Sequence, residues 1–139
     1  MPVHTFSLSM STGGHADIRD ITDEIGQFVY QSGLKNGTAT IFCPSSTSAL
    51  TTIEYENGVL QDLRQLFDEI IPSGRPYAHD SAWGDGNGYS HVRAALLGPS
   101  LSVPFANGRL TLGTWQQIVY IDFDNRPRRR ELVIQILGE

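Results

Sequence analysis

The chain has 139 residues, of which 40% are hydrophobic and 18% are charged. This composition is typical of one globular domain and excludes a disordered or membrane-embedded chain. Its net charge of −5 gives phosphate polymers no general reason to bind, so we expect no nucleic-acid partner. No apolar run approaches the length of a membrane span, and the first ten residues show no basic, apolar leader, so we expect a cytoplasmic protein without membrane contact.

The first half of the chain is predicted to contain three strands and two helices. Apolar and polar residues alternate over residues 6–10, which indicates a half-buried strand. Apolar residues recur at helical spacing over 21–33 and over 60–71, which predicts two amphipathic helices. Residues 38–43 have the composition of a buried strand, and residues 50–56 are its candidate partner.

The second half begins with a polar, glycine-rich segment and is then predicted to form a short helix followed by sheet. Residues 90–98 have helical spacing. The Asn-Gly pair at 107–108 is a strong signal for a hairpin between the apolar runs that flank it. A second hairpin is expected between residues 117–124 and 131–138, with the RPRRR run as its solvated tip or as an ion-pair patch between subunits.

These elements predict an α+β fold, because strands and helices do not alternate regularly enough for a doubly wound fold. We expect one compact domain over residues 1–139, with a mixed or antiparallel sheet packed against two main helices and a short third helix. Cys43 is the only cysteine, which excludes a disulfide within the chain, and we expect it to be a buried structural thiol.

The segment YAHDSAWGDGNGYSH carries more groups suited to metal binding and proton transfer than a loose loop needs. His79 and His91 lie twelve residues apart, a separation that an intervening loop can close. Imidazoles bind zinc and related ions, while Asp80, Asp85 and Asn87 offer oxygen ligands. The same residues also suit a purely structural loop, in which His79 forms a hydrogen bond inside the loop and His91 packs against the following helix.

A run of hydroxyls and two acids form a second polar stretch. The hydroxyls of Ser46, Thr47 and Ser48, together with nearby backbone N–H groups, can hold a phosphate, and an ordinary capped turn is the alternative. In an alternating strand Glu54 and Glu56 share one face, where solvent or a cation must separate their charges. Glu54 or Glu56 is therefore a candidate metal-facing group.

The segment GRLTLGTWQQ supplies a third set of candidate groups. Trp115 can stack on an aromatic ligand or fill the core, and the core role is the more usual one for tryptophan. Alternation along a strand places Gln116 on the opposite face from Trp115. Arg109 can neutralise a phosphate or remain a solvated surface charge.

In chain order, the motifs STSALTTIEYENG, P-x4-Y-x-HD, GDGNGYSH, LLGPSL and GRLTLGTWQQI resemble those of the YjbQ-type family, to which a secondary thiamine-phosphate synthase activity is assigned. The resemblance covers nearly the whole chain. It implies a compact α+β fold, a homotrimer, a polar pocket near a subunit boundary and a histidine cluster associated with a divalent metal. The expected partners are therefore a small phosphorylated metabolite and further copies of the chain.

The resemblance carries over to individual positions. His79 and Asp80 match the HD pair of the family, His91 matches the SH pair, and Gln116 matches the TWQ element. Many relatives have a histidine directly before the threonine of the hydroxyl run, where this chain has Ser46. A three-histidine site is thereby reduced to two histidines, and the metal, zinc or magnesium, needs a further ligand. The candidates for that ligand are Glu54, Glu56, Asp80, Asp85 and water.

The activity implied by the resemblance joins a hydroxymethylpyrimidine diphosphate to a thiazole phosphate and releases diphosphate. A leaving group with this much charge requires a cation, or a proton donated by a histidine. The candidate catalytic residues are His79, His91, Asp80 and Glu54. The candidate metal ligands are His79, His91 and Asp85. The candidate substrate-binding residues are Ser46, Thr47, Ser48, Asn87, Arg109, Trp115 and Gln116.

Two other functions fit the same residues. One is a non-catalytic trimeric protein that binds a phosphorylated metabolite. The other is a metal-dependent hydrolase in which Glu54 or Glu56 acts as the base. Ligand-induced stabilisation without turnover would favour the first, and a zinc ion with an open water position would favour the second.

Overall fold

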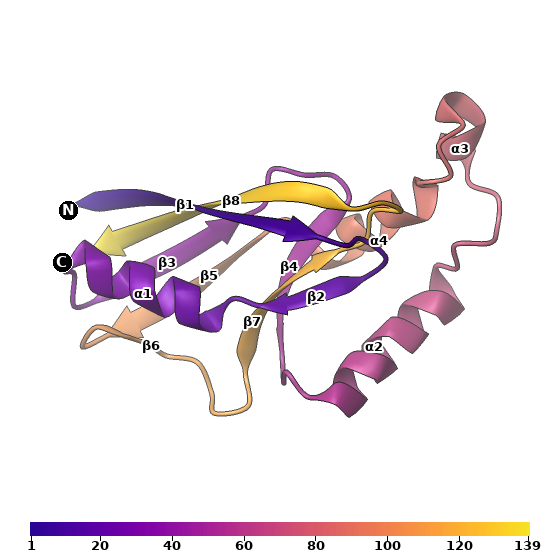
Figure 1. Ribbon diagram of the computed structural model, residues 1–139. Coiled ribbons are helices and arrows are strands. Elements are labelled where there is room, and N and C mark those ends of the chain that lie inside the picture. Colours follow the sequence, from indigo (N-terminus) through magenta and orange to yellow (C-terminus); the bar gives the residue numbers. More distant parts are fainter.

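The computed structural model describes residues 1–139 and has an α+β fold built on two antiparallel sheets (Figure 1). The five-stranded sheet has the order β1-β8-β3-β5-β6 and contains β1 (Val3–Thr12), β3 (Gly37–Phe42), β5 (Ser100–Ala106), β6 (Arg109–Leu110) and β8 (Arg128–Gly138). The three-stranded sheet has the order β2-β7-β4 and contains β2 (Asp17–Asp20), β4 (Ser48–Ile53) and β7 (Gln117–Asp122). The α+β fold that the sequence predicts is therefore confirmed.

The chain also forms four helices. They are α1 (Thr22–Ser32), α2 (Asn57–Ile70), α3 (Ala78–Trp83) and α4 (Gly88–Leu97). Figure 1 shows α1 beside the long strands, with both termini at one end of the molecule and α2, α3 and α4 at the other. No helix is both long and apolar enough to cross a membrane.

The first half of the core lies between the two sheets and α1. Strand β8 alternates strictly, so that Leu132, Ile134 and Ile136 are fully buried while the residues between them face outward. Ile25 and Val29, one turn apart on α1, are also fully buried and belong to the same cluster. This packing fixes the long sheet against α1.

The second half of the core lies on the other face of the three-stranded sheet. Val119 and Ile121 of β7 face this side, and the intervening residues of the strand face the first cluster. Phe67 of α2 meets Phe123 edge to face, with ring centroids 4.9 Å apart. Because β7 is buried on both faces, it is the central strand that connects the two clusters.

Most of the predicted elements are confirmed, because they depend on local patterns. The helices expected over 21–33, 60–71 and 90–98 are α1, α2 and α4. The hairpin at 107–108 connects β5 to β6, with φ values of 53° and 76° that suit the Asn-Gly pair. Helix α3, inside the glycine-rich segment, was not predicted from the sequence.

The predicted partner of residues 38–43 is wrong. Both edges of β3 are occupied, by β5 and by β8, while β4 pairs with β7 in the other sheet. Strand β4 also ends at Ile53, so the predicted strand over 50–56 is too long. The carboxylate of Glu56 accepts hydrogen bonds from the N–H groups of Gly58 and Val59 and caps α2.

The predicted hairpin between residues 117–124 and 131–138 is also wrong. Strand β7 lies in the small sheet and β8 in the large one, so the chain crosses between sheets instead of folding back. Arg126 and Arg129 of the arginine-rich run are exposed, but Arg130 does not lie in a solvated tip. Arg130 turns inward onto Asp122, with N–O distances of 2.7 and 2.9 Å, and this ion pair holds the crossing.

We expect Ile134→Ala to lower the free energy of unfolding by about 2–5 kcal/mol, because it opens a cavity in a fully packed region. Val133→Ala on the same strand removes two methyl groups from the exposed face and should cost less than about 1 kcal/mol. Urea unfolding of both variants measures the difference. Equal losses would contradict the assignment of the two faces of β8.

Candidate functional site

Two histidine rings meet at the end of the molecule that is opposite the termini. His79 lies on α3 and His91 on α4, and their ring centroids are 4.3 Å apart with an angle of 37° between the planes. Both side chains are half-buried. The turn between two short helices thus brings together two histidines that are twelve residues apart in sequence.

Two carboxylates join His79. Its Nδ1 atom lies 3.3 Å from Oδ1 of Asp85 and 3.6 Å from Oδ1 of Asp80. One potential ligand atom from each of these residues falls within 4.8 Å of the others. The Nδ1 atom of His79 is buried and makes no hydrogen bond of acceptable geometry. A buried polar atom without a partner is unusual in a folded protein and suggests a ligand.

Backbone N–H groups orient both carboxylates. Oδ1 of Asp80 accepts a hydrogen bond from the N–H of Gly88 at 2.8 Å, and Oδ1 of Asp85 accepts one from the N–H of Asn87 at 3.2 Å. A Cβ atom at position 88 would lie 2.6 Å from Cβ of Tyr77. Glycine is therefore required there for α3 and α4 to approach each other.

Asn87 anchors this loop to the core and is itself buried. Its Oδ1 accepts hydrogen bonds from the Ser90 hydroxyl and from the N–H of Asn125, at 2.6 and 3.1 Å. Its Nδ2 donates to Oδ2 of Asp124 at 3.3 Å, and the Asn125 amide donates to the carbonyl of Asp85 at 2.8 Å. The side chain that the sequence suggested for substrate binding is thus engaged in hydrogen bonds within the protein.

Asp124 connects the loop to the hydroxyl run. Its Oδ2 accepts a hydrogen bond from the Thr47 hydroxyl at 2.9 Å, and that hydroxyl in turn accepts one from Arg130. Burial acts to raise the pKa of Asp124, but hydrogen bonds from Thr47 and Asn87 and the charge of Arg128 outweigh it and lower the pKa below its ordinary value. Asp124 is therefore a buried anion.

A pocket of about 250 Å³ adjoins His91. Ser45, Ser46 and Ser48 line it together with the imidazole. The Ser46 side chain is exposed, whereas Ser48 is buried and its hydroxyl is 2.8 Å from the Tyr120 hydroxyl. The structure thus brings part of the hydroxyl run, but not Thr47, to the surface beside the histidines.

The other candidate residues lie outside the histidine cluster. Glu54 and Trp115 line a separate hollow, and Trp115 is 73% exposed, so the predicted core role of this tryptophan is wrong. Gln116 donates a hydrogen bond to the Thr52 hydroxyl at 3.2 Å and lines a third hollow. Arg109 is exposed on β6. Within one chain these four residues do not meet the two rings.

The polar residues that support the site were not predicted from the sequence. Asp122, Asp124 and Asn125 follow the apolar run of β7, and Arg130 follows five residues after Asn125. Two buried acids, one at the end of β7 and one two residues beyond it, require buried cationic partners. The nearby arginine-rich run could have indicated these partners, because it is the source of cationic side chains closest in sequence to the two acids.

The fold and the loop cluster define a single-domain α+β protein with a histidine–carboxylate pocket at one end. Residues 6–139 match the family model described as UPF0047 protein YjbQ-like. The chain is 36% identical to a UPF0047 protein of Archaeoglobus fulgidus, over 94% of this chain and 98% of that one. It is 34% identical to the UPF0047 protein YugU of Bacillus subtilis, over 95% of this chain and 98% of that one. The chain belongs to the YjbQ/UPF0047 family.

Two solved structures support this assignment. The YbjQ-like protein of unknown function from Sulfolobus solfataricus superposes with a TM-score of 0.94 at 33% identity, over 99% of both chains. A hypothetical protein from Aeropyrum pernix superposes with a TM-score of 0.90 at 29% identity, over 98% of this chain and 99% of that one. The fold described above is therefore the fold of the family.

We expect Asn87→Ala to destabilise the protein by about 1–3 kcal/mol, since it removes the acceptor of the Asn125 N–H and breaks the hydrogen bonds of Asn87 with Ser90 and Asp124. Hydrogen exchange over residues 80–91 should quicken, because the loop loses its anchor. Ser81→Ala, at an exposed position of α3, is the control. Unchanged exchange in Asn87→Ala would show that the loop does not depend on this side chain.

The lowered pKa of Asp124 also predicts a pH dependence. A carboxyl with a depressed folded pKa contributes its full stability above its unfolded pKa of about 3.9 and loses it as the pH falls through the folded value. Asp124→Asn should therefore be less stable than the parent at pH 7, with a difference that shrinks below about pH 4. Urea unfolding from pH 7 to pH 3 measures both curves, and parallel curves would refute the assignment of a buried anion.

Proposed function

We propose that the chain binds a divalent cation at His79, His91, Asp80 and Asp85 and a phosphate group of a small metabolite in the adjoining pocket. The observation that carries this proposal is the buried Nδ1 atom of His79, which lies near two carboxylates without a hydrogen bond. A cation at that point would give the nitrogen a partner and balance the two negative charges. The residues present therefore fit a metal ion.

Zinc is the cation that this donor set favours. Two imidazoles and carboxylate oxygens are typical zinc ligands, whereas magnesium prefers oxygen ligands and water. Asp80 and Asp85 already accept backbone hydrogen bonds, from Gly88 and Asn87, which orient them as the outer partners of metal ligands usually are. The loop thus supplies both ligands and their supports.

As the reaction, we propose the transfer assigned to the family: a hydroxymethylpyrimidine diphosphate is joined to a thiazole phosphate. The bond from the pyrimidine methylene carbon to the diphosphate oxygen breaks, the thiazole nitrogen bonds to that carbon, and diphosphate leaves. His79, Asp80 and Asp85 would hold the cation, which would supply positive charge to stabilise the departing oxygens. The Ser46 hydroxyl, which lines the pocket beside His91, is positioned to donate a hydrogen bond to the departing oxygens.

The remaining candidate site residues can contribute to this site only if several copies of the chain assemble. Glu54, Trp115, Gln116 and Arg109 lie away from the rings of their own chain, so they reach a substrate there only from another copy. We therefore propose a homotrimer in which these groups face a neighbouring pocket. The exposure of Trp115, at 73%, supports this, since an assembly would cover that apolar side chain.

Binding without catalysis is the second candidate function. The cation ligands and the hydroxyl-lined pocket lie within one chain and suffice to hold a phosphorylated metabolite. A metal-dependent hydrolase with Glu56 as base has less support, because that carboxylate caps α2 and its pKa is lowered by hydrogen bonds from Val59 and Gly58. A group so stabilised as the anion is a weak base.

We expect the double variant His79→Ala/His91→Ala to bind zinc with an affinity at least about tenfold lower than that of the parent, because it lacks both imidazoles. His4→Ala on β1 removes a histidine outside the cluster and should bind zinc as the parent does. Metal analysis of the purified, untagged proteins, followed by competition with a chelator, measures the affinity. Equal zinc content in all three proteins would overturn the metal site.

Turnover separates the two candidate functions. Purified protein given both substrates and a divalent cation should form thiamine phosphate, and His79→Ala should reduce the rate by about 100-fold. Product formation no faster than that of His79→Ala would discard the transferase proposal. Thermal stabilisation by either phosphorylated substrate under those conditions would then leave binding as the function.

A further inference from the structure

A second polar hollow lies on the other side of α4. It has a volume of about 160 Å³ and is lined by His15, Arg64, Asp68, Ser73, Tyr89 and Arg93. Tyr89 and Arg93 are one helical turn apart and share a face of α4. His91 lies between them in sequence and lines the pocket beside the hydroxyl run instead. The two sites are therefore separated by the body of the helix.

The first charged group in this hollow is Arg93, which is only 4% exposed. Its Nε and one terminal nitrogen donate to the carbonyl of Ile71 at 3.0 and 2.9 Å, and its guanidinium lies 5.0 Å from the centre of the Tyr89 ring. The same terminal nitrogen is 3.1 Å from Asp68, whose side chain is 74% exposed. The other terminal nitrogen makes no hydrogen bond within the protein.

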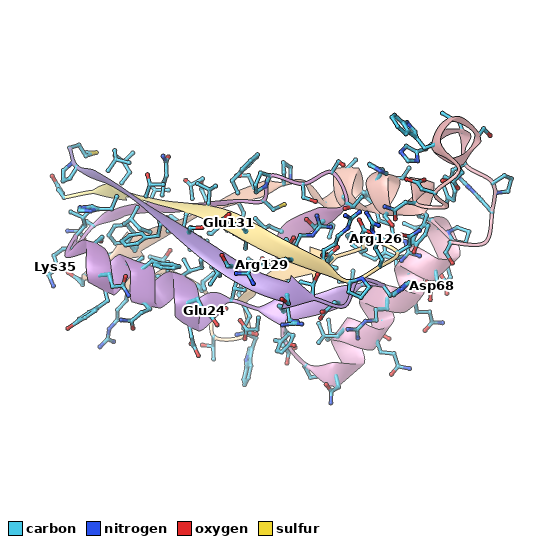
Figure 2. The ribbon with its side chains drawn as sticks, turned by 45° about the horizontal axis from the view of Figure 1, so that its top comes forward. Glu24, Lys35, Asp68, Arg126, Arg129 and Glu131 are labelled. Atoms are coloured by element: carbon cyan, nitrogen blue, oxygen red, sulfur yellow. The ribbon has the colours of Figure 1, made fainter.

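This arrangement leaves the charge of Arg93 incompletely compensated. A buried cation needs a close counter-charge, because the surrounding protein solvates it poorly. The Asp68 side chain is exposed to solvent on α2, at the end of the molecule where Arg126 also lies (Figure 2). Solvent screens an exposed carboxylate of this kind, so its pairing with Arg93 contributes little.

A second guanidinium faces the same hollow. Arg64 donates from Nε to the carbonyl of Ala16 at 3.2 Å, and its two terminal nitrogens have no partner in the protein. The Ser73 hydroxyl and the His15 ring also line the hollow and make no side-chain hydrogen bond. Two guanidiniums against one carboxylate leave an excess positive charge in the hollow, surrounded by free donors.

The turn that carries His15 has an uncommon backbone. Gly14, His15 and Ala16 have φ values of 70°, 54° and 61°, in the left-handed region that side chains disfavour. A Cβ atom at position 14 would lie 2.5 Å from the carbonyl oxygen of Asp124, so the turn is pressed against the end of β7. This conformation brings His15 to the rim of the hollow and directs the Ala16 carbonyl to Arg64.

We propose that this hollow binds the phosphate group of a small molecule. Donors converge on it from the turn after β1, from α2, from the segment after α2 and from α4, and a tetrahedral oxyanion can accept from several directions at once. Its volume suits a phosphate and few further atoms, since pockets for drug-sized ligands begin at about 300 Å³. The site lies beyond the proposed metal site and does not depend on it.

Titration with inorganic phosphate, followed by amide NMR at low salt, tests the proposal. Phosphate should shift the amide signals of Gly14, His15, Ala16 and Ser73 in the parent protein. Arg64→Gln should weaken that binding by at least about tenfold, because it removes two free charged donors. Lys35→Gln makes the same change of charge at the opposite end of the molecule (Figure 2) and should bind as the parent does.

Arg64 is exposed, so its variant should keep the fold, and its amide spectrum checks this directly. Binding of equal strength in Arg64→Gln, or shifts confined to residues 45–48, would overturn the proposal. Acetate that binds as tightly as phosphate would overturn the choice of phosphate. The double variant His79→Ala/His91→Ala should keep the phosphate response at Ser73, which distinguishes failure of this site from failure of the metal site.

Discussion

The ion pair between Arg130 and Asp122 is the interaction on which the two-sheet architecture depends. Asp122 ends the buried strand β7, and Arg130 reaches it from β8 with two short N–O contacts. Thr12 of β1 donates to the same carboxylate. Breaking a buried pair of this kind by removing one partner costs about 3–5 kcal/mol. The pair therefore fixes the point at which the chain leaves the small sheet and enters the large one.

The geometry of the candidate site depends on this crossing between the sheets. Asp124, two residues beyond Asp122, receives hydrogen bonds from Thr47 and from Asn87. Thr47 belongs to the hydroxyl run that lines one pocket, and Asn87 opens the helix that carries His91. Two segments about forty residues apart in sequence are thereby attached to the same carboxylate. The buried charges thus serve the site without being exposed to a ligand.

The sequence predicts what local patterns determine and fails where partners are distant. Helices α1, α2 and α4 were predictable, because apolar spacing and helix ends are encoded within about a dozen residues. The pairing partner of β4 could not be predicted, because the composition of a strand does not determine which of two antiparallel sheets it joins. Trp115 was expected inside because of its size, yet it lies in a loop before β7. The composition of the glycine-rich segment suggested that His79, His91 and the two aspartates converge. It did not predict α3, the helix that brings His79 to His91.

Helix α3 is held by few contacts, and this bears on how the histidine cluster works. None of its side chains is buried, and Figure 1 shows it projecting beyond α4. It is attached by the hydrogen bond from the Gly88 N–H to Asp80 and, at its N-cap, by the buried Tyr77, whose hydroxyl donates to the carbonyl of Pro72. Segments with so little buried surface open at low free energy. A ligand that bridges His79 of α3 and His91 of α4 would therefore spend part of its binding energy on ordering α3, so that affinity and local order rise together.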